Sequence, residues 1–246
     1  MSSAPANKPP WMIRTRSMHF VVLVAAFTVF SAIVASGVTS GADDAASRYF
    51  KSIQGNAAVD TVMIVITTMG DVSTLFLVGI VLTIIRRTRK AGMIFLIALI
   101  VIVVLVMYMK PLIGRENPPY GFEPALGLPE NFSLENDSLA PFAAGFSYPS
   151  GHASRTTAFA FIIGFLLYQK SRKAGYAIWA LPVVVGITRL YVMQHYPTDL
   201  IGGFLFGGMV SVVLANAMKL EEPFSMSRIK GKEDSKPSSR PPGGNL

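Results

Sequence analysis

Two of the chain's three histidines lie in polar stretches beside long apolar runs. His152 completes the motif Pro-Ser-Gly-His within SYPSGHASR, and His195 lies four residues before Asp199 within TRLYVMQHYPTD. Where two imidazoles meet at one site, one can attack phosphorus while the other protonates the leaving oxygen. A carboxylate such as that of Asp199 can orient the His195 ring and stabilise its charged form. The third histidine, His19, matches no such pattern.

Cationic and hydrogen-bonding groups accompany these histidines. The side chains of Lys110 and Arg189 can hold phosphate oxygens and neutralise the charge that grows in the transition state. A helix that begins at Pro-Ser-Gly-His would offer free N–H groups and the positive end of its dipole to an anion. Gly151 would let the backbone approach a phosphate closely, and Ser150 adds a hydroxyl donor. Together these residue types predict phosphoryl transfer.

The sequence contains no carboxylate cluster or His/Asp ligand set that indicates a metal. We therefore expect no cofactor and a metal-independent site, in which Lys and Arg replace Mg²⁺. Taken singly, these residues have ordinary structural roles, because a basic side chain can extend to the headgroups and Asp199 can cap a helix. Their combined spacing favours a catalytic role for these residues over separate structural roles. Asp71, in TTMGDVSTLF, is expected to cap a membrane helix where a shorter outer helix breaks.

Membrane helices must hold these residues in place. Hydrophobic residues make up 51% of the 246-residue chain and charged residues only 15%. A stretch of about 20 apolar residues suffices to cross a bilayer. The absence of cysteine excludes disulfides and thiol chemistry. We predict an all-α membrane protein with six transmembrane helices, at 19–38, 66–85, 91–109, 153–169, 175–193 and 199–218.

The basic residues predict the orientation of these spans. Of the 22 Lys and Arg residues, 16 fall in segments that six spans place on one side, which the positive-inside rule makes cytoplasmic. Both termini are therefore expected to be cytoplasmic, in a multi-pass plasma-membrane protein. The net charge of +8 does not indicate nucleic acid as a partner, because the basic residues form short blocks between apolar runs. Four further basic residues lie near outer helix ends, which is a functional signal: Lys110, Arg115, Arg155 and Arg189.

The chain divides into two polar ends, one helical domain and one long outer loop. Residues 1–17 are expected to form a disordered cytoplasmic leader and 221–246 a disordered cytoplasmic tail, since the tail composition cannot bury a core. Residues 18–220 form the predicted six-helix domain. Its outer loop, 111–150, is long enough to be either functional or disordered, and its aromatic residues favour a loop that packs.

Three motifs resemble the signature of the type 2 phosphatidic acid phosphatase (PAP2) superfamily, which reads K-x6-R-P, P-S-G-H and S-R-x5-H-x3-D. The second motif is intact at 149–152, and the third occupies 188–199 with threonine in place of its serine. The first begins at Lys110 and keeps its final proline, but Asn117 stands at the arginine position. The resemblance extends over about residues 19–218 and implies a helical core like that of the vanadium haloperoxidases.

The resemblance also implies the roles of the site residues. His195 would be the nucleophile that forms a phosphohistidine, and Asp199 would orient it. His152 would be the general acid that later activates water. Either Arg115 or Arg155 is expected to replace the arginine missing from the first motif. The phosphate would be bound by Lys110, Ser150, Gly151, Arg189 and, through its amide, Asn117.

The leading interpretation is a phosphatase that hydrolyses a lipid phosphate or an isoprenoid diphosphate, of undecaprenyl or dolichyl type, at the extracytoplasmic face. A phosphatidylglycerophosphate or phosphatidic acid phosphatase is an alternative, as is a phosphotransferase that uses a lipid hydroxyl as acceptor. A transporter or a catalytically silent binding protein is a third interpretation, since Asn117 departs from the motif. The gathering of the polar groups at one membrane face argues against transport. No residue indicates the lipid tail or the oligomeric state.

Overall fold

The computed structural model of the protein describes residues 8–128, 132–138 and 140–222, and the regular elements there are helices apart from one isolated β-bridge. In chain order the helices are α1 (Met18–Ala35), α2 (Ser40–Ser52), α3 (Ala57–Thr67), the 3-10 helix η1 (Thr68–Gly70), α4 (Val72–Ile84), α5 (Arg89–Ile113), the 3-10 helix η2 (Pro141–Ala143), α6 (Gly151–Lys170), α7 (Arg172–Ala177), α8 (Ala180–Tyr191) and α9 (Pro197–Ala217).

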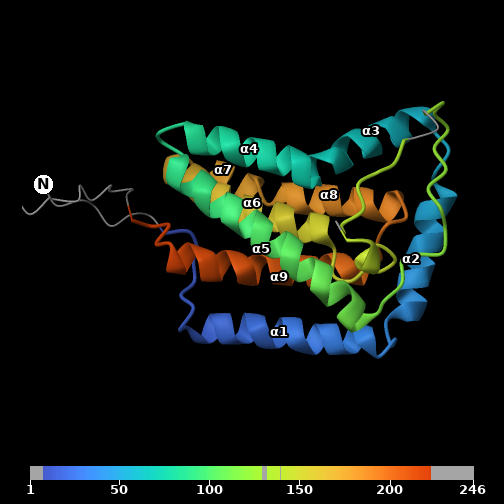
Figure 1. The fold of residues 1–246 in the computed structure, drawn as a ribbon, viewed down its shortest axis with the longest axis horizontal. Helices are drawn as coiled ribbons and strands as arrows, with labels where there is room; N and C mark the ends of the chain where they lie inside the picture. The colour runs from blue at the N-terminus through green and yellow to red at the C-terminus, as the bar shows by residue number, and fades with distance from the viewer. Residues whose placement is uncertain (1–7, 129–131, 139, 223–246) are drawn as a thin grey trace, which may run out of the picture.

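The helix α6 is the centre of the bundle. It packs against α5, α7, α8 and α9, and α1 lies along α9 at one edge of the molecule (Figure 1). The helix α4 lies along α5 at the opposite edge, and α2 crosses one end of the bundle (Figure 1). Of the 20 residues in α6, 15 are buried, so this helix is the inner scaffold against which its neighbours pack.

Glycines allow α9 to lie close to the backbone of α6. A Cβ at Gly203 would lie 2.6 Å from the Ser150 carbonyl oxygen, and one at Gly207 would collide with the Ser154 backbone. Since ordinary contacts begin near 3.4 Å, a larger residue at either position would move a helix. The close approach brings the N-termini of the two helices together, where the Ser150 N–H donates to the Asp199 carbonyl oxygen at 3.1 Å.

Four helical segments among the described residues are long and apolar enough to cross a membrane, and a bent pair of helices makes a fifth. They overlap five of the six predicted spans. The predicted span 153–169 corresponds to α6, whose first turns carry too many polar side chains to meet the same standard, so its crossing stays a prediction. The segments are Met18–Ala35, Arg89–Ile113, Arg172–Tyr191, Pro197–Ala217 and the pair Ala57–Gly70 with Val72–Ile84, bent by 52°.

The bend in that pair lies at Gly70 and Asp71. Gly70 packs against the His152 ring, where a Cβ would lie 2.6 Å from Cδ2. Asp71 is the N-cap residue of α4, at the predicted break between two helices, but its side chain makes no capping hydrogen bond among the described residues. The Val72 N–H donates instead to Glu135 Oε2 at 2.7 Å. A carboxylate from a distant loop therefore caps α4, and the Asp71 side chain is left to face His152.

The described part of the predicted leader, residues 8–17, packs against the bundle. The Trp11 ring meets the rings of Tyr168, Tyr176 and Trp179 at centroid distances of 5.5, 5.6 and 5.5 Å. The Trp11 Nε1–H also donates to the Phe161 carbonyl oxygen at 3.3 Å. The prediction of a disordered leader therefore does not describe these residues, because Trp11 gives them an aromatic anchor. The rest of the predicted leader and most of the predicted tail lie outside the described residues.

The long connection between α5 and α6 folds over the end of the bundle that α2 crosses (Figure 1). Its two ends are joined to each other, because the Ser147 N–H donates to the Arg115 carbonyl oxygen at 2.8 Å. A second backbone hydrogen bond, from Asn117 to Gly145 at 3.2 Å, extends this junction. The connection is thus a closed loop with a fixed base rather than a free strand of chain.

Candidate active site

Four helix ends meet beneath the long connection. Lys110 lies in the last turn of α5 and Arg189 in the last turn of α8, while His152 begins α6 and His195 precedes α9. Each of the four side chains is at most 2% exposed. Lys110 and Arg189 both interact electrostatically with one carboxylate, that of Asp137. The structure therefore gathers both histidines and both predicted cations around a single buried point.

The N-terminus of α6 presents its free N–H groups to the same carboxylate. Ser150 caps the helix, and its Oγ accepts from the Ala153 N–H at 3.3 Å. The Gly151 N–H donates to Asp137 Oδ2 at 2.5 Å and the His152 N–H to Oδ1 at 3.1 Å. Unpaired N–H groups and the helix dipole make such a terminus an anion site. The anion in this site is a side chain of the protein itself.

Asp137 is bound on its other sides as well. Its Oδ2 lies 2.6 Å from His195 Nε2, its Oδ1 lies 3.3 Å from Arg155 Nη2, and His152 Nδ1 also contacts Oδ1. Ser150 Oγ donates to Oδ2 at 3.3 Å. Burial alone would raise the pKa of Asp137, but the charges and hydrogen bonds of the two histidines lower it well below its usual range. The buried carboxylate is therefore ionised at neutral pH.

His195 lies between two carboxylates. Its Nε2 faces Asp137, and its Nδ1 lies 3.4 Å from Asp199 Oδ2 without a hydrogen bond to any described residue. Asp199 also accepts the Tyr196 N–H at 2.8 Å, within the capping box of α9. The position of Asp199 thus suits both roles considered for it in the sequence. Because Asp199 lies beside Nδ1, the other ring nitrogen of His195, Nε2, faces the Asp137 carboxylate.

Arg115 and Asn117 lie to one side of the anion. Arg115 Nη2 is 2.6 Å from Asp43 Oδ2, Nη1 is 2.9 Å from Asp199 Oδ1, and the guanidinium stacks 4.2 Å from the centre of the Tyr196 ring. Asn117 donates its amide to a backbone carbonyl of the long connection at 3.3 Å. Within the described residues neither forms a hydrogen bond with the anion. Arg115 steadies Asp199, and Asn117 holds the base of the connection.

Arg155 reaches the anion from the second turn of α6. Its Nη2 lies 2.8 Å from Glu135 Oε1, 2.9 Å from His152 Nδ1 and 3.3 Å from Asp137 Oδ1. Burial raises the pKa of Glu135, and the charge of Arg155 opposes that shift. Arg189 donates to the Glu135 carbonyl oxygen at 2.9 Å, while its buried Nε has no partner among the described residues. Of the two candidates for the missing arginine, Arg155 is the one placed at the anion.

A second group of side chains could in principle hold a metal. Asp71, Glu135 and His152 offer three ligand atoms within 4.8 Å of one another, and Asp71 Oδ1 lies 2.9 Å from His152 Nε2. The Arg155 guanidinium already contacts both Glu135 and His152, and its charge opposes a second cation there. These residues fit a hydrogen-bonded network of charges better than a metal centre.

Sequence reasoning missed three of the carboxylates around this site, those of Asp43, Glu135 and Asp137. Asp43 lies in α2 and reaches Arg115 across the end of the bundle. Glu135 and Asp137 lie in the long connection, where no motif or spacing distinguishes them from its other acidic residues. The available signal was the length of the connection and its aromatic content, which favoured a packed and functional loop.

Fold and site together define a helical protein with several candidate membrane spans, in which four helix ends surround one buried carboxylate. Residues 90–222 match the PAP2 superfamily, and this match includes all three motifs of the site. The chain therefore belongs to the PAP2 superfamily. The crystal structure of a transmembrane PAP2-type phosphatidylglycerolphosphate phosphatase from Bacillus subtilis shares the fold, with a TM-score of 0.67 at 22% identity, over 84% of this chain and 98% of that one.

Several curated relatives are lipid phosphatases. An undecaprenyl-diphosphatase from Sulfolobus acidocaldarius is 29% identical over 168 residues, which are 66% of this chain and 73% of that protein. The undecaprenyl-diphosphatase BcrC from Bacillus subtilis is 27% identical over 71% of this chain and 85% of its own. A lipid A 1-phosphatase from Rhizobium etli is 44% identical over 84 residues, so the chain matches only about a third of its length.

Proposed function

We propose that the protein is a membrane phosphatase that hydrolyses a lipid phosphate or an isoprenoid diphosphate through a phosphohistidine at His195. The observation that carries the proposal is the anion at the N-terminus of α6, 2.6 Å from His195 Nε2. The carboxylate is held by helix N–H groups, an arginine and two histidines. The same groups can donate hydrogen bonds to the oxygens of a phosphate. Phosphorus at that position would face the His195 nitrogen.

The positions of the two histidines suit a two-step reaction. In the first step His195 Nε2 attacks phosphorus, the bond from phosphorus to the leaving oxygen breaks, and His152 gives its proton to that oxygen. In the second step His152 takes a proton from water, the water oxygen attacks phosphorus, the bond from phosphorus to His195 Nε2 breaks, and inorganic phosphate leaves. Arg155, Arg189 and Lys110 neutralise the charge that grows on the phosphoryl oxygens in both transition states.

An isoprenoid carrier diphosphate is our preferred substrate. Two of the relatives that match most of this chain are undecaprenyl-diphosphatases, and these matches extend over 73% and 85% of those proteins. Phosphatidylglycerophosphate and phosphatidic acid remain alternatives, since other relatives act on other lipids. A phosphotransferase would use the same phosphohistidine with a lipid hydroxyl in place of water, so an acceptor lipid in the assay separates the two reactions.

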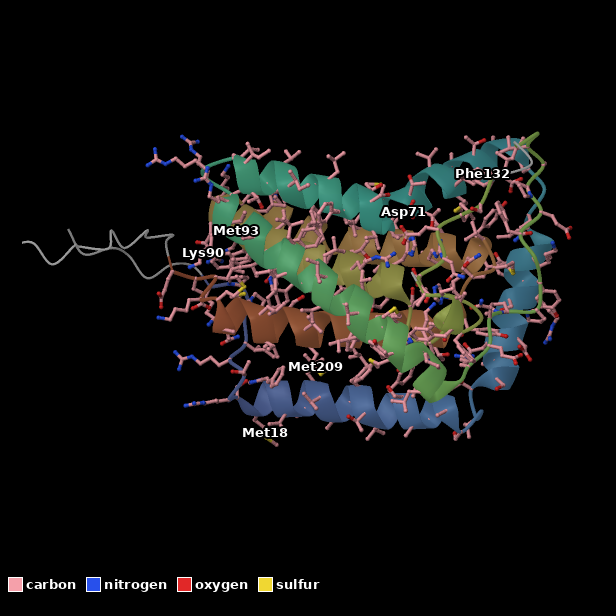
Figure 2. All side chains as sticks on the ribbon, viewed as in Figure 1. Met18, Asp71, Lys90, Met93, Phe132 and Met209 are labelled. Atoms are coloured by element: carbon pink, nitrogen blue, oxygen red, sulfur yellow. The ribbon has the colours of Figure 1, made fainter. Side chains whose placement is uncertain are left out.

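We place the site at the extracytoplasmic face. Figure 2 shows Lys90, in the first turn of α5 beside the basic loop that precedes this helix, at one end of the molecule and Phe132, in the connection over the site, at the other. The positive-inside rule assigns the end that carries basic loops to the cytoplasm. A lipid could then keep its tail among the helices and present its phosphate to the opposite end.

The test is phosphate release by the full chain in detergent from undecaprenyl diphosphate, phosphatidylglycerophosphate and phosphatidic acid, with EDTA present. We expect release from the diphosphate to be fastest and to survive EDTA. His195→Ala should abolish release and the acid-labile phosphoryl label, because it removes the proposed nucleophile. His19→Ala is the matched control, since His19 is exposed on α1.

Three results of these assays would contradict the proposal. Full activity in His195→Ala would show that phosphoryl transfer does not pass through this residue. Loss of all activity with EDTA, restored by a divalent cation, would replace the metal-independent mechanism. Release that requires a lipid alcohol and transfers phosphate to it would identify a phosphotransferase.

A further inference from the structure

The carboxylate of Asp137 stands where the phosphate of the proposed reaction would bind. It accepts the N–H groups of Gly151 and His152, which are the helix-terminal donors expected to hold a phosphate. It also contacts His195 Nε2, the proposed nucleophile, at 2.6 Å. The same side chain therefore occupies both the anion-binding donors and the position in front of the nucleophile.

The residues next to Asp137 extend this occupation to the arginines. The Glu135 side chain lies 2.8 Å from Arg155 Nη2, and its carbonyl oxygen accepts from Arg189 Nη2 at 2.9 Å. Asn136 lies between Glu135 and Asp137 in the chain. Its side-chain amide donates to the Ala144 carbonyl oxygen at 2.9 Å, which fixes this segment to the base of the loop. We call residues 134–138 the acidic segment. It engages two cations and two helix N–H groups that a phosphate would otherwise take.

A phosphate and the Asp137 carboxylate cannot share this position. The 2.6 Å separation of Oδ2 from His195 Nε2 leaves no space for a phosphorus atom between them. Two anions that need the same N–H donors also repel one another at short range in a buried site. The Asp137 side chain is fully buried, so it must leave the site for a phosphate to enter.

We infer that Asp137 is an internal mimic of the substrate phosphate, and that the acidic segment must be displaced from the anion site before phosphoryl transfer begins. The inference rests on the proposed function for the identity of the ligand. Its consequence is that the Asp137 carboxylate and an added oxyanion compete for the same donors at the N-terminus of α6. The apparent dissociation constant of an oxyanion equals its intrinsic value divided by the fraction of molecules in which Asp137 has left the site.

Orthovanadate is a suitable probe, because it is a tetrahedral oxyanion and its binding requires no turnover. In Asp137→Asn the internal anion loses its charge, so the dissociation constant of orthovanadate should fall by up to about tenfold if the site is filled in nine of ten molecules. Orthovanadate should also raise the thermal unfolding midpoint of Asp137→Asn more than that of the unsubstituted protein.

Two control variants separate displacement from a general charge effect. Glu123→Gln removes a carboxylate from the same connection, where its side chain is 82% exposed in an ion pair with Lys51, and should leave orthovanadate binding unchanged. Asp71→Asn removes a carboxylate that contacts His152 but does not touch the helix N–H donors. An equal gain in affinity in Asp71→Asn and Asp137→Asn would overturn the inference, because only repulsion would then be at work.

Movement of the acidic segment can be measured directly, since the chain has no cysteine. With Ser138→Cys as the single thiol, saturating orthovanadate should increase the rate of labelling by a maleimide. Labelling that does not change would overturn the inference, as would orthovanadate that binds neither form. If orthovanadate accelerates labelling while no lipid releases phosphate, the proposed function fails and the displacement stands. If lipids release phosphate and labelling stays constant, the displacement fails and the phosphatase stands.

Discussion

Gly203→Ala tests whether the close approach of α9 to α6 positions the active site. The added Cβ would lie 2.6 Å from the Ser150 carbonyl oxygen and 2.8 Å from Ala153 Cβ. Both neighbours belong to the rigid backbone or its first side-chain carbon, so no rotamer change relieves the contact. Ordinary contact begins at 3.4 Å, so the two helices must separate by about 0.8 Å, the difference between 3.4 and 2.6 Å.

The separation would be transmitted to the chemistry, because α9 carries Asp199 and α6 carries His152. A misplacement of about 1 Å can lower a rate by about 100-fold. We therefore expect kcat for phosphate release to fall about 10- to 100-fold in Gly203→Ala. Overpacking of this kind costs about 1–3 kcal/mol, so the thermal unfolding midpoint should fall as well.

Gly208→Ala is the matched control, on the same helix and with the same added atom. Its Cβ would meet no other heavy atom within 4 Å among the described residues. Alanine favours a helix over glycine by up to about 1 kcal/mol, so this variant should keep its activity and unfold at the same or a higher temperature. Equal kcat values in Gly203→Ala and Gly208→Ala would refute the idea that helix separation controls the site.

Two further predictions concern charges at the site. Arg155→Lys should lower kcat/KM for phosphate release about 100-fold, because lysine lacks the planar fork that faces the anion, whereas Arg115→Lys should act mainly by lowering the thermal unfolding midpoint. Equal losses of kcat/KM in the two variants would contradict the placement of Arg155. Asp137 has a lowered pKa in the folded state, so its contribution to stability is present above the unfolded value of about 4 and is lost as the pH falls toward the folded value. Thermal unfolding followed from about pH 6 to about pH 3 should therefore show a steeper loss of stability in the unsubstituted protein than in Asp137→Asn, and parallel curves would contradict the assignment.

The motif residues could be placed from the sequence because each lies at a helix end. Lys110 ends one long apolar run, and His152 begins another. His195 precedes α9 and Asp199 lies in the first turn of that helix, so a spacing of four residues keeps the two side chains close together. Family resemblance then supplies the roles expected of them. Such short-range relations are the part of a site that spacing can predict.

The carboxylates around the motif residues could not be placed in this way. Asp43 and Arg115 are 72 residues apart and meet only because α2 crosses the end of the bundle. Asp137 and His195 are 58 residues apart and meet only because the long connection folds inward. Such contacts depend on the path of the loop, which hydrophobic periodicity does not encode. The capping hydrogen bond expected from Asp71 comes from Glu135 for the same reason, since Glu135 lies in the same connection and accepts the Val72 N–H.

The polarity of α6 has a consequence for how the protein enters its membrane. Its first turns bury His152, Ser154 and Arg155, so this helix would be costly to expose to lipid on its own. It becomes stable only when α5, α8 and α9 surround it and satisfy its polar groups. On the prediction that α6 crosses the membrane, its insertion would have to wait for the synthesis of α8 and α9, because both follow it in the chain. We therefore expect that a chain truncated before α9 would insert α6 poorly, because the polar side chains of this helix would lack the neighbours that satisfy them.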